Sequence, residues 1–216
     1  MRVTKEHIKK VIKKGNWIIR ADTDGVAYEG FKWNAIGEWT EAPDWDPTPE
    51  CGRGLHGQDS KHGGFITSRT RLVFCETYGR HVDLSDKVKV RRARILMVGL
   101  PAGLVMEGSL SLSGCTLPKG LRLPDNIGGS LDLRGCTLPK GLKMPDSIGE
   151  DLDLDGCTLP KGLKMPDSIG GDLDLCGCTL PEGLRLPDSI GGFLCLSGCT
   201  LPKGLRIPKN VKRIIR

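Results

Sequence analysis

Apolar and polar positions recur with a constant long period in the second half of the chain. From residue 108 onward, a pattern close to G-x-L-x-L-x-G-C-T-L-P-K-G-L-x-L-P-D-x-I-G returns every 21 residues, in copies that span 108–128, 129–149, 150–170, 171–191 and 192–212. A constant period over this many copies is typical of a solenoid, in which each copy forms one coil. Residues 100–107 match part of a copy, and we expect them to form a capping half-repeat.

The apolar positions within a copy indicate which side chains point inward. In the third copy they are Leu152, Leu154, Cys157, Leu159, Leu163, Met165 and Ile169. Leu152 and Leu154 alternate with aspartates, which is the period of a half-buried strand. Two prolines per copy would interrupt a helix, so the remainder is expected to be extended or turn-like. Corners are expected at these prolines and at Gly-Gly pairs such as 128–129.

The segment L-x-L-x-x-C-x-L of each copy resembles the core of a leucine-rich repeat, and the LP-rich return resembles the LPX-type repeats of bacterial effector proteins. One spacing departs from that family, because Ile148 precedes Leu152 by four residues where three are expected. A parallel β-helix is therefore the alternative. Both interpretations predict a mainly β protein whose residues 108–216 form a parallel β-solenoid of about five 21-residue coils.

Residues 1–99 are expected to form a separate small α+β domain, because they hold all four Trp, both Tyr and all four His. Thr4 is a suitable N-cap for a short helix that ends at Gly15. Apolar alternation predicts strands over 17–21, 26–31, 70–75 and 87–98, with a turn at 22–25 and further extended chain over 33–39. The acidic, proline-rich stretch 38–50 predicts a loop.

The most distinctive pattern outside the repeats is Gly30-Phe31, then Trp39, then Cys51-Gly52-Arg53-Gly54-Leu55-His56. It resembles a small domain of phage and bacterial proteins in which K-G-F precedes C-x-x-G-[FL]-H, and the similarity covers roughly residues 26–98. That family brings no activity with it. The resemblance implies a phage or mobile-element origin.

Positions that recur every 21 residues form columns on the solenoid surface. Phe193 occupies one of the outward strand positions in the last coil. In the coils before it, the outward positions hold six aspartates: Asp132, Asp151, Asp153, Asp155, Asp172 and Asp174. The return segments carry nine basic residues and one acidic residue: Lys119, Arg122, Lys140, Lys143, Lys161, Lys164, Glu182, Arg185, Lys203 and Arg206. The net charge of +6 therefore hides two faces of opposite sign.

Stacked like charges repel, so the acidic columns need an explanation. They serve either solubility after recent duplication or the binding of a basic partner or cations. The spacing of a calcium-binding loop is missing. The basic columns could contact phosphates, but no aromatic residues interleave them, which makes nucleic acid a weaker hypothesis.

Five cysteines recur at the same position of each copy: Cys115, Cys136, Cys157, Cys178 and Cys199. We interpret them as a buried packing ladder in preference to a redox or metal site. Cys176 and Cys195 occupy outward positions and are expected to be surface thiols, which indicates a reducing, cytoplasmic compartment. No stretch is apolar enough for a membrane span, and residues 1–15 lack the features of a secretory signal.

Chemistry in the N-terminal domain is a weaker hypothesis. Metal-competent residues occur without tightly spaced pairs, so neither a metal nor a cofactor is expected: Cys51, His56, His62, Cys75 and His81. His56 with Glu76, and Arg53 beside them, are the candidates for acid–base work. The segments Tyr-Glu-Gly-Phe and Arg-Gly-Leu-His faintly resemble ADP-ribosyltransferases. A binding pocket would have to gather Trp39, Trp45, Arg53 and His56 in one concavity.

The favoured hypothesis is recognition of a protein partner by the acidic strand face, with Phe193 as an apolar anchor. The phage-like resemblance suggests a host protein of defence or regulation, which would be inhibited. The alternative is an enzyme or nucleotide-binding protein that uses the N-terminal domain, with the solenoid as a targeting module. A homodimer through the last coil, near Phe193 and Ile214-Ile215, is a further hypothesis, although the basic tail 209–216 could instead protect that edge.

Overall fold

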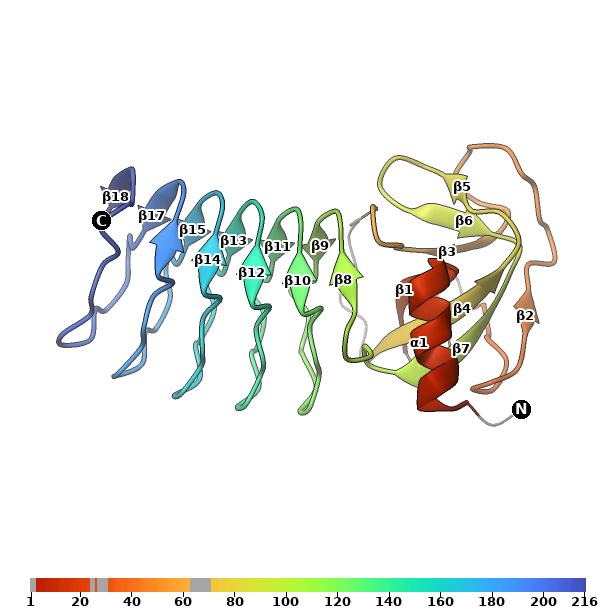
Figure 1. The fold of residues 1–216 in the computed structure, drawn as a ribbon, viewed down its shortest axis with the longest axis horizontal. Helices are drawn as coiled ribbons and strands as arrows, with labels where there is room; N and C mark the ends of the chain where they lie inside the picture. Colours follow the sequence, from red (N-terminus) through yellow and green to blue (C-terminus); the bar gives the residue numbers. More distant parts are fainter. Residues whose placement is uncertain (1–2, 24–25, 27–30, 63–70) are drawn as a thin grey trace.

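The chain forms an elongated molecule with a small globular domain at one end and a stack of coils extending from it (Figure 1). The computed structural model describes residues 3–23, 26, 31–62 and 71–216. The fold is mainly β and includes a parallel β-solenoid of about five coils, as the repeat predicts.

In its described residues, the N-terminal domain consists of one helix and two antiparallel sheets. Helix α1 (Lys5–Lys14) begins after Thr4, whose side chain accepts a hydrogen bond from the N–H of His7, and ends at Gly15, which is left-handed with φ 69°. The first sheet has the order β1 (Trp17–Asp22), β4 (Arg71–Tyr78), β7 (Arg92–Val98) and β2 (Thr40–Glu41). The second has the order β3 (Leu55–Gly57), β6 (Val88–Val90) and β5 (Val82–Asp83).

Most predicted elements of this domain are confirmed, with two differences. The strand predicted over 87–98 is divided at Arg91 between β6 and β7, which belong to different sheets. The segment 33–39 is not a strand, because the backbone N–H of Asn34 donates to Thr40 Oγ1 and its side chain donates to the carbonyl of Trp39, which folds the segment on itself. The strand predicted over 26–31 and the turn over 22–25 lie largely outside the described residues.

The solenoid is built from two parallel sheets, and each full coil contributes one short strand to each of them (Figure 1). One sheet contains β8 (Val105–Met106), β10 (Asn126–Ile127), β12 (Ser147–Ile148), β14 (Ser168–Ile169) and β16 (Ser189–Ile190). The other contains β9 (Leu110–Ser111), β11 (Leu131–Asp132), β13 (Leu152–Asp153), β15 (Leu173–Asp174), β17 (Phe193–Cys195) and β18 (Arg213–Ile215). Strands on two sides of each coil are typical of a β-helix. The capping segment 100–107 supplies β8.

Equivalent residues of neighbouring coils lie directly over one another. Leu131 pairs with Leu152 and Leu152 with Leu173, so the inward leucines form continuous columns. All seven inward positions predicted for the third copy are buried, from 0% exposure at Leu152 to 8% at Leu163. The same core continues into the N-terminal domain through Trp17 and Phe74. That domain therefore covers the first coil and closes one end of the solenoid.

The corner between the two sheets brings the backbones of adjacent coils into contact. A Cβ atom on Gly149 would lie 2.0 Å from the carbonyl oxygen of Gly128, and one on Gly170 would lie 2.0 Å from that of Gly149. Gly191 stands in the same relation to Gly170. Only glycine fits a column where one backbone packs on the next.

We expect Gly170→Ala to lower the free energy of unfolding by about 3 kcal/mol, because the new methyl group can be accommodated only by separating two coils. Gly156→Asn is the matched control, since Gly156 has φ 69° and nothing within 4 Å of an added Cβ, and asparagine tolerates that conformation. Urea unfolding followed by circular dichroism measures both. Equal stability of the two variants would contradict the close approach at the corner.

Candidate functional site

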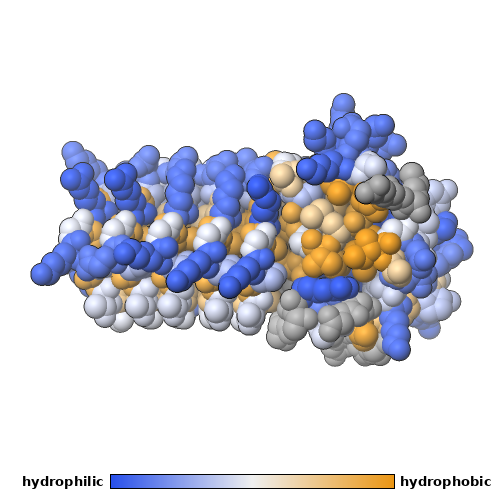
Figure 2. Space-filling view, turned by 90° about the horizontal axis from the view of Figure 1, so that it is seen from below, coloured by the Kyte–Doolittle hydropathy of each residue, from blue (hydrophilic) through white to orange (hydrophobic). Residues whose placement is uncertain are grey.

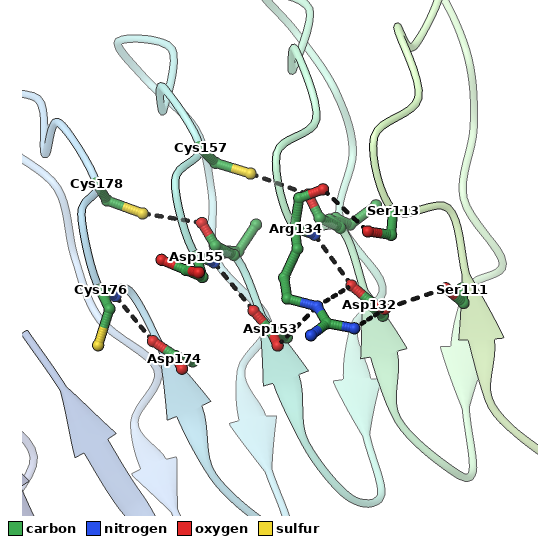
Figure 3. A network of polar contacts seen from close by, with 12 residues as sticks. Ser111, Ser113, Asp132, Arg134, Asp153, Asp155, Cys157, Asp174, Cys176 and Cys178 are labelled. Atoms are coloured by element: carbon green, nitrogen blue, oxygen red, sulfur yellow. Dashed lines mark hydrogen bonds and ion pairs between the residues drawn. The ribbon is translucent and has the colours of Figure 1, made fainter. Parts of the chain in front are cut away.

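The outward positions of β11, β13 and β15, with the residues on either side of them, form an acidic face (Figure 3). We use this name for the six aspartates predicted from the repeat: Asp132, Asp151, Asp153, Asp155, Asp172 and Asp174. The parallel register assembles them, because Asp132 pairs with Asp153 and Asp153 with Asp174. Side chains separated by 21 residues in sequence thereby lie about one strand spacing, or ~4.8 Å, apart.

Five of these aspartates also serve the fold. One carboxylate oxygen of Asp132, Asp153 and Asp174 accepts the N–H two residues later, at 3.0, 3.0 and 2.8 Å, which fixes the turn after each strand. Asp151 and Asp172 instead accept the backbone N–H of the equivalent residue in the next coil, at 2.7 and 2.6 Å. Neither solubility nor partner binding, the two explanations drawn from the sequence, anticipates this role.

Negative charge on the acidic face is only partly neutralised. Arg134 pairs with Asp132 at 2.9 Å and with Asp153 at 3.2 Å (Figure 3). Burial and the neighbouring charges of Asp174 and Asp132 nevertheless raise the pKa of Asp153 above its usual value, despite hydrogen bonding from the N–H of Asp155 and the attraction of Arg134. Within the described part of the chain, the other four aspartates form no ion pair. The face therefore favours the approach of a cationic group.

The return loops on another side of the coils carry the opposite charge. They hang below the two sheets in Figure 1, and Figure 2, seen from below, shows regular rows of hydrophilic side chains along the solenoid. Two of these lysines pair with aspartates of their own loops, Lys143 with Asp146 at 3.5 Å and Lys164 with Asp167 at 3.2 Å. Such exposed pairs contribute little to stability.

Cys176 and Cys195 form a disulfide between neighbouring coils, so the prediction that they are surface thiols is wrong. Cys195 lies on β17 opposite Asp174, and Cys176 lies in the turn that follows β15. Their Cα atoms are 5.6 Å apart, within the range that a disulfide spans. The argument from these residues to a reducing compartment loses its basis. Asp174 lies with the two sulfurs in the one group of three potential metal ligands found among the described residues. The disulfide removes the thiolates that would bind a metal there.

The periodic cysteines form the packing ladder that the repeat predicts. The thiols of Cys136, Cys157 and Cys178 each donate to a backbone carbonyl of the preceding coil, at 2.9, 3.0 and 3.0 Å. All three are buried. Burial raises the pKa of Cys136 and of Cys178 to about 12, so neither is a nucleophile near neutral pH.

His56 and Glu76, the predicted acid–base pair, have different neighbours. Glu76 accepts hydrogen bonds from His7 at 2.9 Å and from Arg94 at 2.7 Å. His56 lies on β3 opposite Lys89, and its buried Nε2 has no hydrogen-bond partner among the described residues. Burial, followed by the charges of Lys87 and Lys89, lowers the pKa of His56. No described contact joins the two residues.

The four residues of the predicted pocket are divided between two places. Trp39 packs against Tyr78, with the guanidinium groups of Arg92 and Arg94 at 4.9 and 4.6 Å from its ring centroid. The ring centroid of Trp45 lies 6.0 Å from the ammonium of Lys89. Lys89 is on β6, where it pairs with His56 of β3. Arg53 is exposed and pairs with Asp46.

A polar network around Asp59 escaped the sequence-based prediction. Its carboxylate contacts His62 at 2.7 Å and His81 at 3.4 Å, and His81 contacts Thr77 at 2.8 Å. The order Thr, His, Asp is that of a nucleophile, base and orienting acid. Thr77 is only 3% exposed, however, so a substrate could not reach its hydroxyl. His62 is three residues from Asp59, but His81 and Thr77 are about twenty residues away, so the sequence alone does not mark the network.

The Asp59 network borders the junction with the solenoid. The carbonyl of Ser60 accepts the N–H groups of Glu107 and Gly108, at 2.6 and 2.8 Å. A Cβ on Gly108 would meet the carbonyl oxygen of Lys61 at 2.0 Å, as the corner glycines meet the coil before them. Residues 60–61 thus continue the corner column, and the network holds in place the segment that caps the first coil.

A shallow groove of about 660 Å³ runs along the five-stranded sheet. Its lining includes Asn126, Ser147, Ser168, Ser189 and Asn210, together with corner glycines. None of the predicted site residues lines this groove.

Comparison of the chain with protein-family models, with curated proteins and with solved structures finds no match. Among the described residues, the helical structure is too short or too polar to cross a bilayer.

Alkylation tests the cysteine assignments. With iodoacetamide at pH 8 and no reductant, we expect Cys51 to react in the folded protein, because it is the exposed one among seven free cysteines. The buried ladder thiols should react only after unfolding. Cys176 and Cys195, which are partly exposed, should react only after reduction of their disulfide. Peptide mass spectrometry identifies the labelled sites. Rapid labelling of Cys157 in the folded protein would contradict the packing role.

A pH series tests the Asp59 network. Burial alone would raise the pKa of Asp59, but hydrogen bonds from His81, the N–H of Lys61 and His62 outweigh it and hold the pKa well below its usual range. The stability that this carboxylate contributes is present above about pH 4 and is lost as the pH falls through the folded pKa. For His62, burial alone would lower the pKa, but hydrogen bonds and charge attraction from Asp59 and Asp83 outweigh burial and raise it. The stability from His62 is present below about pH 6.5 and is lost as the pH rises through its folded pKa.

We therefore expect Asp59→Asn to cost about 2 kcal/mol at pH 5–6 and less at both extremes of pH. Asp83→Asn is the matched control, because Asp83 contacts the same histidine from a position that is 69% exposed. Urea unfolding at each pH measures the difference. A cost that does not vary with pH would show that Asp59 acts through packing alone.

Proposed function

We propose that this protein is a non-enzymatic recognition protein whose solenoid presents the acidic face to a basic surface of a protein partner. The observation that carries the proposal is the concentration of carboxylates without ion pairs on one parallel face, around an Asp153 whose pKa is raised. A cationic partner group would relieve this repulsion, so complementary charge would favour binding and speed encounter.

Rigidity of the face adds to the proposal. Five aspartates are held by hydrogen bonds to backbone N–H groups, so their carboxylates are ordered before a partner arrives. Binding to a preorganised surface loses less conformational entropy. Phe193 is 43% exposed, and its N–H donates to Asp172, which places an apolar ring beside the charges. An aromatic anchor next to a charged patch is typical of an interface hot spot.

The biological partner is a further part of the proposal. The resemblance of residues 26–98 to a phage and bacterial domain supports a host protein of defence or regulation, inhibited by capture on the solenoid. This part stands on analogy of sequence, whereas the charge of the partner surface is argued from the geometry of the face.

Asp155→Lys is the sharpest test, because Asp155 is exposed and its side chain forms none of the backbone bonds that hold the other five aspartates. We expect it to weaken binding of a fluorescent oligo-arginine peptide at least about tenfold, and to reduce the salt dependence of that binding. Glu182→Lys is the matched control, since it makes the same charge change on a return loop. Fluorescence anisotropy measures both.

Equal weakening by the two variants would show that net charge, not the acidic face, governs binding, and would contradict the proposal. Affinity purification from a bacterial host with the wild type and Asp155→Lys then tests the host-protein part. A host protein that the wild type and Asp155→Lys capture equally well would show that this partner does not bind the acidic face.

A further inference from the structure

The last coil leaves apolar core positions uncovered at the C-terminal end of the solenoid. Leu201 is 44% exposed, whereas Leu180, at the same position one coil earlier, is 6% exposed. Ile214 stacks on the fully buried Leu194 but is itself 38% exposed, and Ile215 is 40% exposed. At the N-terminal end, by contrast, the small domain shares its core with the first coil.

The uncovered end also carries a free strand edge. β18 is the final strand of the six-stranded sheet and pairs on one side with β17. The carbonyl of Ile215 accepts the N–H of Leu196, so this residue directs its backbone groups toward β17. Direction alternates along a strand, and the N–H and C=O of Ile214 therefore face the open side. Such groups are a template for another strand.

Charge distinguishes this end from the rest of the solenoid. Between Cys199 and Arg216 the chain has six cationic residues and no Asp or Glu: Lys203, Arg206, Lys209, Lys212, Arg213 and Arg216. All six are exposed, and none forms an ion pair with a described residue. An apolar cross-section and an open strand edge are thus surrounded by positive charge.

We propose that the end of the solenoid formed by β18 and the last coil binds an extended acidic segment of another protein, which adds as a strand to the free edge. Backbone hydrogen bonds to Ile214 supply the pairing, and apolar side chains of the segment cover Ile214 and Leu201. Acidic side chains of the segment meet the six cations. This site shares no residue with the six aspartates of the acidic face, although β18 lies in the same sheet, and it binds a partner of opposite charge.

A second copy of the chain fits this end less well. Two such ends facing one another would bring both sets of six cations together, with no Asp or Glu from residues 199–216 between them. Like charges juxtaposed across an interface repel one another and disfavour association. The homodimer hypothesised from the sequence is therefore disfavoured by the charge at this interface. The cations could instead serve only to protect the edge from aggregation. In that case the end would bind no peptide, so the peptide-binding experiment distinguishes the two roles.

The test uses the full chain and a labelled ten-residue peptide that alternates glutamate with valine. We expect saturable binding by fluorescence anisotropy, and at least tenfold weaker binding of the peptide with lysine in place of glutamate. Lys209→Glu with Arg213→Glu should weaken binding at least tenfold, whereas the control pair Lys140→Glu with Lys161→Glu, on exposed loop tips, should leave it unchanged. Ile214→Pro, which removes the edge donor, should also weaken it.

Three results would overturn the proposal. Binding that both charge pairs reduce equally would assign the effect to net charge. Preference for a single-stranded oligonucleotide of equal charge would assign the end to nucleic acid. The sedimentation coefficient could also increase with protein concentration. If Ile214→Pro abolished that increase, the end of the solenoid would be assigned to binding a second copy of the chain. Because the Asp155→Lys experiment uses a basic probe, failure of either proposal leaves the other intact.

Discussion

The parallel hydrogen-bond register between coils is the constraint on which the rest of this structure depends. It places each residue over its equivalent 21 positions away, at a spacing of about 4.8 Å. Leucines then stack on leucines and bury a continuous core, while corner glycines allow one backbone to touch the next. A change at any one position is thus felt by the coils on both sides.

The same register creates the electrostatic character of the molecule. It stacks carboxylates on carboxylates along one face, and the fold compensates by turning many of them toward backbone N–H groups. A carboxylate held in this way cannot move away from its neighbours. Burial, with the added repulsion of Asp174 and Asp132, therefore raises the pKa of Asp153 in the middle of the face. The arrangement that stabilises the turns thereby also maintains a fixed anionic surface.

The two ends of the solenoid are finished differently. At the N-terminal end, the carbonyls of residues 60 and 61 continue the corner column, and apolar residues of the small domain complete the core. At the C-terminal end, β18 has a free edge surrounded by cations. The solenoid therefore has an anionic side and a cationic end, which are the surfaces of the two proposals made above.

The sequence by itself determined the solenoid, its inward residues and the columns of the acidic face, because a constant period fixes which residues stack. It also gave α1 and most strands of the N-terminal domain through local alternation and capping. Only the tertiary structure decided that Cys176 meets Cys195, that Trp39 lies apart from Trp45, and that Asp59 joins His62 to His81. The disulfide joins Cys195 to a residue two positions beyond Asp174, its 21-residue equivalent, and the other contacts depend on irregular loops. No period relates positions in irregular loops, so the chain order alone does not bring them together.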